Sequence, residues 1–445
     1  MPGGLTITNI RAFGAAAAVI AMVTAACSGG SSGGPGRSAG PTDAAVACAA
    51  GTTKIEVQSW WTTDGEATAL RKLFDQFNKD NPTLCAYNAA IAGGAGAPAQ
   101  AVVKSRTLAG QPPDTFQVHM GHELLDSYVT ISAGSVLTPL DTSIINPLAF
   151  PTVVDSIISG SDGKVYTVPL DIHRANELWY NKKVFTDKGL KPPKTWADFK
   201  TVADALTATN ITPLALGDNA IWAFGIVFET ILIAELGADG FSGLWTGATR
   251  WSDPKVTAAL NQLKTVSGYV NSDHSSLTWD QANQRLIDGK AGMTIMGDWA
   301  NTDDVAKGFS DYGWAPAPGN NGIYQALADS FPLPANAPHP AAVKQLLAFM
   351  ASARGQDIFN PAKGSIPARI DAGIPPAGSQ QYNAYQHSAM SDWIRNKIVP
   401  SMELGAAAAP AWRSAIEAAL TTFEADGNVA AMQQALVATA QAAGT

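Results

Sequence analysis

The sequence predicts a fold of two α/β lobes. The chain has 445 residues, and a single hydrophobic core stops growing at about 250–300 residues, so two lobes are expected. Strand-like and helical segments alternate along most of the chain, which is typical of α/β proteins with parallel sheets. No internal repeat interrupts this alternation.

Residues 1–26 have the pattern of an export signal. Arg11 supplies a positive charge, and the apolar run over residues 13–26 is shorter than a membrane span of about 20 residues. The run ends in Val-Thr-Ala-Ala before Cys27 and resembles a bacterial lipobox, so we expect a lipid on Cys27. An ordinary signal peptide cleaved nearby is the alternative. Residues 27–49 are then the lipidated cysteine and a flexible Gly/Ser/Pro-rich tether.

The chain has three cysteines. If Cys27 carries lipid, Cys48 and Cys85 remain as a pair in an oxidising compartment. Cys48 precedes the first predicted strand, Lys54 to Trp61, and Cys85 precedes the second, near residues 86–92. Neighbouring parallel strands would bring the two starts together, which makes a disulfide reasonable. Two buried free thiols are the alternative.

The first predicted helix follows a Thr-Thr-Asp-Gly turn. Its apolar residues recur at helical spacing, and it ends at Asn81-Pro82. These residues are Leu70, Leu73, Phe74 and Phe77.

Further elements have clear boundaries. A short strand is predicted over Thr115 to His119, after two prolines, and residues 164–180 are predicted to leave one lobe and enter the other. A capping box of Thr195 and Asp198 opens a helix over residues 196–207, and Asp253-Pro254 opens another. The last 35 residues are Ala-rich and predicted to be helical.

Composition excludes several classes of function. The net charge is −8 and no basic stripe is present, so nucleic acid is not an expected partner. The sequence contains no HExxH, CxxC or P-loop pattern, which leaves metalloprotease, thiol-redox and nucleotide-hydrolysis activities without support. Twelve tryptophans exceed what a core of this size needs, and they favour a neutral ligand with apolar faces.

Seven collinear segments span most of residues 52–405: SWWTTDGEATAL (59–70), PPDTFQVHMG (112–121), DGKVYTVPLDIHRANELWYNKKVF (162–185), PPKTWADF (192–199), GKAGMTIMGDWA (289–300), LADSFPLP (327–334) and NPAKGSIPAR (360–369). Together they resemble the extracellular solute-binding proteins of ABC sugar importers, the family 1 group that contains maltose-binding protein. The Trp-Trp, Gln-Val-His and Gly-Asp-Trp elements are most similar to the bacterial glucose/galactose-binding subgroup.

The resemblance implies a type II periplasmic-binding-protein-like fold, with a hinge and a ligand cleft between two α/β lobes. Lobe 1 would comprise residues 50–170 and 330–375, and lobe 2 residues 171–329 and 376–445. The implied function is capture of a monosaccharide, a glucose-like hexose, and its delivery to an ABC permease. The protein would be a monomeric lipoprotein on the outer face of the bacterial membrane, without cofactor, metal or enzymatic activity.

A pyranose needs flat aromatic surfaces for its C–H faces and converging polar groups for its hydroxyls. In open α/β sheets such residues follow the carboxyl ends of strands. The resemblance and this placement select ten residues: Trp60, Trp61, Glu66, Gln117, His119, His173, Trp279, Trp299, Asp329 and Lys363.

Alternation along the first strand points Trp60 and Trp61 to opposite faces, so one would pack in the core while the other stacks on sugar. Glu66 would accept hydroxyl hydrogen bonds, although it would also complement a helix dipole. Gln117 and His119 share one face of a short strand, and a core histidine is the alternative for His119.

The remaining candidates come from later segments. His173 would reach the cleft from the lobe junction, and Asp329 would accept from hydroxyls. Trp299 is preferred to its neighbour Asp298 as the residue pointing inward. Lys363 would donate to a sugar oxygen, with a solvated lysine as the alternative.

Leu404 departs from the glucose-binding subgroup, whose members place a histidine just before a late glycine. This change leaves a disaccharide or glucoside as the alternative ligand. A secreted glycoside hydrolase using Glu66 and Asp329 as its two carboxyls is the rival reading. A receptor that presents sugar to a sensor would need the same site.

Overall fold

The computed structural model describes residues 48–130 and 134–445. The predicted signal (1–26), Cys27 and most of the tether lie outside the described residues. Within the described ranges, no helix combines the length and apolarity needed to cross a membrane.

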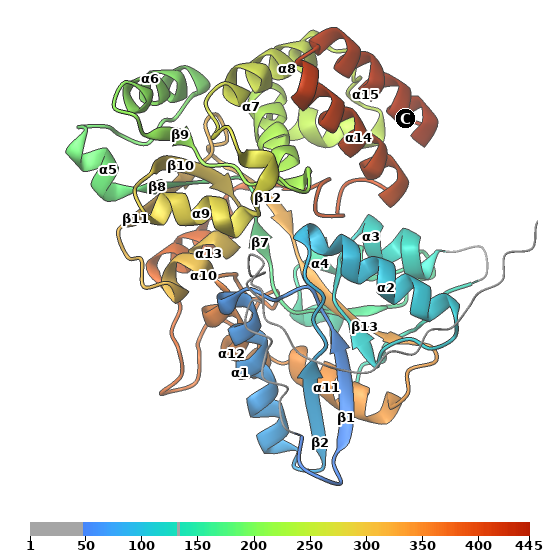
Figure 1. Cartoon of the computed structure of the whole chain (residues 1–445). Coiled ribbons are helices and arrows are strands. Elements are labelled where there is room, and N and C mark those ends of the chain that lie inside the picture. The colour runs from blue at the N-terminus through green and yellow to red at the C-terminus, as the bar shows by residue number, and fades with distance from the viewer. Residues whose placement is uncertain (1–47, 131–133) are drawn as a thin grey trace, which may run out of the picture. The chain divides into compact units, whose positions relative to one another are not determined.

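The first α/β group is built on a parallel sheet of order β2-β1-β3. Its strands are β1 (Thr53–Gln58), β2 (Leu84–Asn88) and β3 (Thr115–Phe116). Helix α1 (Asp64–Asp80) packs against β2 and against α12 (Ala353–Lys363), as Figure 1 shows for the blue and orange segments. Residues distant in sequence therefore share one core.

Strand β13 (Asp329–Pro334) pairs in antiparallel fashion with three short strands: β4 (Val118–His119), β5 (Leu137–Thr138) and β6 (Thr167–Pro169). The strand predicted over residues 115–119 is interrupted at Gln117. The cause is a change of partner, because β3 pairs with β1 whereas β4 pairs with β13.

The second α/β group contains a four-stranded sheet of order β11-β8-β10-β9. Its strands are β8 (Glu177–Asn181), β9 (Thr212–Leu214), β10 (Ala291–Met296) and β11 (Tyr312–Pro316). Only β9 and β10 pair in parallel, and β8 runs antiparallel to β10 and β11. The expectation of parallel sheets is therefore wrong for this group, because β8 enters it directly from the connection between the groups rather than through a helical crossover.

Two connections between the groups lie side by side. Strand β7 (His173–Arg174) is on the outward connection, and it pairs antiparallel with β12 (Ile323–Leu327), from which the chain returns into β13. Strand β14 (Lys397–Pro400) completes this sheet, in the order β14-β12-β7. Because the two connections are paired, His173 and Asp329 lie at the same junction.

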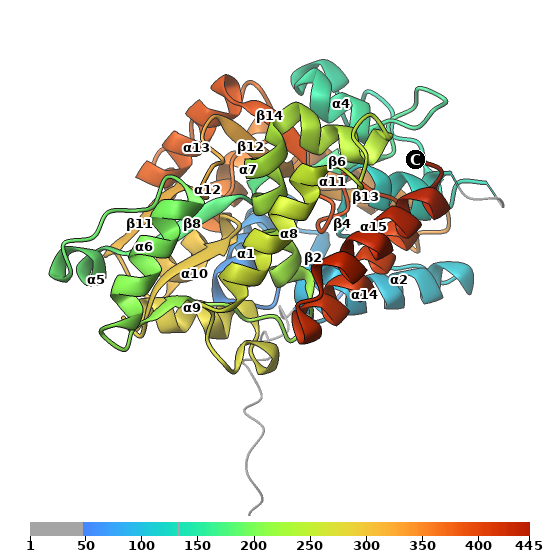
Figure 2. The ribbon, with the colours of Figure 1, turned by 90° about the horizontal axis from the view of Figure 1, so that it is seen from above.

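Helices cover the sheets. They are α2 (Ala97–Leu108), α3 (His122–Leu124), α4 (Thr152–Ile158), α5 (Lys182–Asp187), α6 (Trp196–Thr207), α7 (Trp222–Thr246), α8 (Pro254–Ser267), α9 (Trp279–Ile287), α10 (Trp299–Ala306), α11 (Pro340–Met350), α13 (Ala384–Arg395), α14 (Pro410–Asp426) and α15 (Val429–Ala443), with the short turns η1 (Gly94–Gly96), η2 (Leu125–Val129), η3 (Pro147–Ala149) and η4 (His274–Ser276). The C-terminal pair α14 and α15 packs with α7 and α8, which Figure 2 shows from above.

The predicted helix starts are confirmed. Thr195 and Asp198 form the reciprocal capping box of α6, and the Asp253 side chain caps α8 with Pro254 in its first turn. These signals are reliable because they satisfy backbone N–H groups locally, whatever the tertiary packing. The Ala-rich terminus forms α14 and α15, also as predicted.

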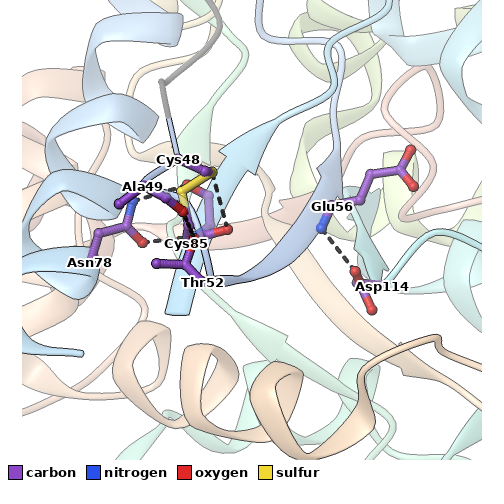
Figure 3. The surroundings of a disulfide bond; sticks show 8 residues. Cys48, Ala49, Thr52, Glu56, Asn78, Cys85 and Asp114 are labelled. Atoms are coloured by element: carbon purple, nitrogen blue, oxygen red, sulfur yellow. Dashed lines mark hydrogen bonds between the residues drawn. A yellow bond between two sulfur atoms is a disulfide. The ribbon is translucent and has the colours of Figure 1, made fainter. Parts of the chain in front are cut away.

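The predicted disulfide is present. Cys48 and Cys85 are bonded with their Cα atoms 5.7 Å apart, and Figure 3 shows the bond beside β1 and β2. The second strand begins earlier than predicted, so Cys85 lies inside β2, directly opposite Lys54 of β1.

Removing this bond should destabilise the protein. The bond joins residues 37 positions apart, and a loop of that length predicts about 3–4 kcal/mol of stabilisation through the unfolded chain. A variant with serine at both Cys48 and Cys85 should therefore unfold at lower urea concentration than the oxidised protein. Reductant should shift only the parent protein, and equal midpoints for the parent and the variant would contradict the prediction.

Candidate ligand-binding site

A cavity of about 160 Å³ lies at the junction of the two α/β groups. Nine of the ten predicted site residues line it: Trp60, Trp61, Glu66, His119, His173, Trp279, Trp299, Asp329 and Lys363. Gln117 is the exception and lies behind the wall. The cavity therefore gathers side chains from the segment after β1 and from α1 at one end of the chain, and from α12 near the other.

Trp60 and Trp61 follow β1 and separate into two roles. Trp61 is 1% exposed and packs against Phe331 and Phe359, with ring centroids 5.9 and 5.2 Å away. Trp60 is half-buried and tilts against the His119 ring at 4.9 Å. Glycine at position 96 leaves room for the Trp60 ring, because a Cβ on residue 96 would lie 2.4 Å from that ring. Trp60 is thus the more open aromatic surface of the pair.

Three further tryptophans come from the second group. Trp279 and Trp299 are the first residues of α9 and α10, so each side chain is placed by a helix start. The Trp299 ring lies edge-on to His173 at 5.6 Å and 6.2 Å from Trp222, which also lines the cavity. Trp222 was not predicted as a site residue, because it begins the apolar helix α7 and cannot be distinguished in the sequence from the core residues around it.

His173 is fully enclosed by carboxylates. Its Nδ1 hydrogen bonds to Asp298, and its Nε2 lies 3.2 Å from Asp171 Oδ2 and 3.6 Å from Asp329 Oδ2. Burial and the Lys363 charge lower the pKa of His173, but Asp298 and Asp171 outweigh them and raise the pKa to about 10. Among the described residues, Nε2 has no hydrogen-bond partner of good geometry. This imidazolium N–H faces Asp171 and Asp329, and a ligand hydroxyl that reaches it would compete with those two carboxylates.

The preference for Trp299 over Asp298 agrees with this geometry. Asp298 is turned to His173 and accepts the backbone N–H of Arg174 at 3.1 Å, while Trp299 faces the cavity. Sequence reasoning missed the supporting role of Asp298.

Asp329 is the central acceptor. Its Oδ1 accepts from Gln117 Nε2 at 2.7 Å and lies 3.9 Å from His119 Nε2. Gln117 in turn accepts the Trp60 backbone N–H at 3.1 Å, so it joins Asp329 to the aromatic wall from behind. Burial and the nearby Asp171 raise the pKa of Asp329 to about 6, against the lowering effect of His119, His173 and Lys363.

Glu123 orients His119 and was not predicted. Its carboxylate contacts His119 Nδ1 at 3.1 Å and accepts from Arg413 at 3.0 Å. Burial opposes the charge on both partners, yet their attraction raises the pKa of His119 and lowers that of Glu123 to about 2. The pair leaves His119 Nε2 directed to the cavity side. No local sequence signal distinguished Glu123 from any other acidic residue in a first helical turn.

Glu66 and Lys363 form an ion pair inside the cavity. Lys363 Nζ donates to Glu66 Oε1 at 2.9 Å and stands 5.2 Å from the centre of the Trp61 ring. Lys363 is only 1% exposed, so the solvated alternative is excluded. It is the last residue of α12 rather than part of an open turn, and Gly364 ends the helix with φ of +81°. Burial lowers the pKa of Lys363, but Glu66 raises it above its usual value.

One corner of the cavity is apolar. Leu327 and Leu404 both line it and are 4% and 2% exposed. Leu404, the residue that departs from the glucose-binding subgroup, therefore lines the cavity.

A metal is poorly suited to this cavity. Asp171, His173 and Asp329 do have ligand atoms within 4.8 Å of one another. The buried ammonium of Lys363 acts on both His173 and Asp329, however, and already supplies positive charge there. The arrangement is better suited to a neutral ligand with hydroxyl groups and apolar faces.

The two α/β groups, their paired connections and the cavity at the junction define a two-lobed ligand-binding protein. Residues 60–357 match the family of bacterial extracellular solute-binding proteins, and the chain belongs to that family. An ABC transporter extracellular-binding protein of Pyrococcus horikoshii is 36% identical over 398 residues, covering 88% of this chain and 86% of the relative.

A second relative supports this assignment, and a solved structure supports the fold. The xylose/arabinose-binding protein of Haloferax volcanii is 28% identical over 400 residues, covering 87% of this chain and 84% of the relative. The solved structure of the bacterial solute receptor AcbH, described as preferring β-D-galactopyranose, superposes with a TM-score of 0.77 at 22% identity, covering 88% of this chain and 99% of AcbH. The predicted family and fold class are confirmed. The lobe boundaries remain a prediction.

Proposed function

We propose that the protein is the substrate-binding lipoprotein of an ABC sugar importer and that it captures a monosaccharide, a glucose-like hexose, between its lobes. The convergence of aromatic surfaces on buried polar groups carries the proposal. Trp60, Trp279 and Trp299 offer faces for sugar C–H groups. Asp329 accepts from hydroxyls, and the His173 Nε2–H donates to them.

The cavity size favours a single sugar ring. Its volume of about 160 Å³ is close to the 150 Å³ of an engineered cavity that binds benzene. A disaccharide would need the lobes to open further. Relatives support the ligand class: a probable sugar-binding periplasmic protein of Rhizobium meliloti is 28% identical over 338 residues, covering 74% of this chain and 79% of the relative.

Specificity would come from hydrogen bonding. Micromolar affinity needs about −8 kcal/mol, which stacking and several hydroxyl contacts can supply. An epimer that misplaces one hydroxyl would leave a buried acceptor such as Asp329 unpaired, at about 1–3 kcal/mol. Ligand contacts to both lobes would favour the closed form in proportion to its higher affinity.

Capture without turnover fits the carboxyl environment. Glu66 is paired with Lys363 at 2.9 Å, and Asp329 accepts from Gln117 at 2.7 Å, so both carboxyls are oriented as hydrogen-bond acceptors for a hydroxylated ligand. The ABC permease would be the protein partner. The extracytoplasmic location follows the family, and the lipid on Cys27 and the monomeric state belong to the same proposal.

A calorimetric panel tests the proposal. Glucose, galactose, xylose, arabinose, maltose and lactose would each be titrated into the purified protein, with thermal shifts following RT ln(1 + [L]/Kd). We expect a hexose to bind with micromolar or tighter Kd. Binding of a charged solute but of no sugar would refute the proposal, and steady hydrolysis of an aryl glycoside would indicate an enzyme instead.

Sugar affinity should depend on pH through Asp329. Its pKa is raised to about 6 in the free protein, and hydroxyl donors in the complex favour its charged form and lower that pKa. Binding then releases a proton near and below pH 6, so affinity should be constant from pH 7 to 8 and fall as the pH drops below 6. Titrations at pH 5, 6, 7 and 8 would measure this, and an affinity that rises on acidification would contradict it.

A further inference from the structure

A second cluster of ionisable side chains lies away from the sugar cavity. Asp218 lies in the loop after β9, His274 in η4, and Glu424 near the end of α14. His274 Nδ1 is 2.8 Å from Asp218 Oδ1 and 3.5 Å from Glu424 Oε1, and the three ligand atoms lie within 4.8 Å of one another. None of the three lines the sugar cavity.

Two carboxyl groups face a single imidazole in this cluster. The Asp218 side chain is 0% exposed, and its Oδ2 receives no N–H or hydroxyl donor from the described residues. Arg285 of α9 is paired with Asp273. The buried Asp218 Oδ2 is therefore an acceptor that a bound cation could satisfy.

We propose that Asp218, His274 and Glu424 form a binding site for a divalent transition metal of the zinc class. One imidazole nitrogen and two carboxylate oxygens are zinc ligands, at about 2.0–2.2 Å from the ion. Tetrahedral geometry at that radius separates ligand atoms by about 3.3 Å, and the separations of 2.8 and 3.5 Å at His274 bracket this value. The imidazole disfavours calcium and magnesium, which prefer oxygen ligands.

Access is sufficient for an ion. The side chains of His274 and Glu424 are 21% and 18% exposed, so a metal could enter and keep a water as its fourth ligand. Metal ligands must be deprotonated, so metal binding would release any proton that the three side chains hold.

The site would brace two segments that lead into the sugar cavity. The Asp218 N–H donates to the His274 carbonyl at 3.1 Å, and the Asn219 N–H donates to the Leu277 carbonyl at 3.0 Å. Trp222 and Trp279 begin helices a few residues beyond these bonds. A metal held also by Glu424 would join both segments to α14.

Calorimetry on the untagged, chelator-treated chain tests this inference. ZnCl2, MnCl2 and CaCl2 would be titrated at pH 7 in two buffers of different ionisation enthalpy, with metal content measured after dialysis. We expect one zinc per chain, proton release on binding, and weaker binding of calcium. Asp218→Asn and Glu424→Gln should each weaken zinc binding at least tenfold.

His122→Ala is the matched control. His122 makes a similar 2.9 Å contact with Asp126, but on an exposed helical turn, so its loss should leave zinc affinity unchanged. Melting curves of each variant establish that it is folded. Absence of zinc binding, or zinc affinity unchanged in both Asp218→Asn and Glu424→Gln, would overturn the inference. Sugar binding is measured separately, so failure here leaves the proposed function standing.

Discussion

Replacing Asp329 with alanine is expected to weaken sugar binding at least tenfold and to have the largest effect of any single change in the cavity. The Asp329 side chain is buried and already accepts from Gln117 at 2.7 Å. Its loss would leave Gln117 and the sugar hydroxyls without their acceptor, and each unpaired buried donor costs about 1–3 kcal/mol. Tenfold corresponds to about 1.4 kcal/mol, so one such donor is sufficient.

Two comparisons separate binding from folding. Asp329→Asn keeps the shape but removes the charge, and it should fall between the parent and the alanine variant. Asp357→Ala removes another buried carboxylate, which accepts from Tyr382 at 2.8 Å and does not line the cavity. We expect Asp357→Ala to lower the melting temperature without changing sugar affinity. Equal affinity of Asp329→Ala and the parent would show that the acceptor lies elsewhere.

The local elements of this fold were predictable because their signals are local. The helical spacing of Leu70 to Phe77 and the caps at Thr195 and Asp253 depend on neighbouring residues alone. Strand partners were harder to predict. Gln117 interrupts a strand only because β3 and β4 pair with different strands, and the antiparallel direction of β8 depends on where the chain crosses between groups.

The residues in the cavity wall and behind it also differ in how readily the sequence predicts them. Trp60 and Trp299 stand out in the sequence because they occur in segments shared with a known family. Asp171, Glu123 and Trp222 do not, since each acts through a contact with a residue far along the chain or lies in an apolar helix. The ion pair of Glu66 and Lys363 joins residues 297 positions apart. No local sequence pattern predicts a contact between residues so far apart in the chain.

Replacing Trp299 with alanine is likewise expected to weaken sugar binding at least tenfold. The indole packs edge-on to His173 at 5.6 Å and closes the cavity wall beside Trp222. Its removal would lose a flat face for the sugar ring and admit water beside the His173 donor, which weakens the hydrogen bond made there. Trp299→Phe keeps a smaller flat face and should retain part of the affinity.

Trp251→Ala is the appropriate control for this loss of an aromatic ring. Trp251 is 3% exposed, against 7% for Trp299, and packs on Trp245 at 5.3 Å away from the cavity. Both alanine variants should unfold more easily, because deleting a buried tryptophan costs about 3–5 kcal/mol. Only Trp299→Ala should change the Kd measured by calorimetry below the melting temperature. If both variants bind sugar like the parent, the stacking surface must be assigned to Trp60 and Trp279 instead, since these are the other tryptophans whose half-buried faces remain open to the cavity.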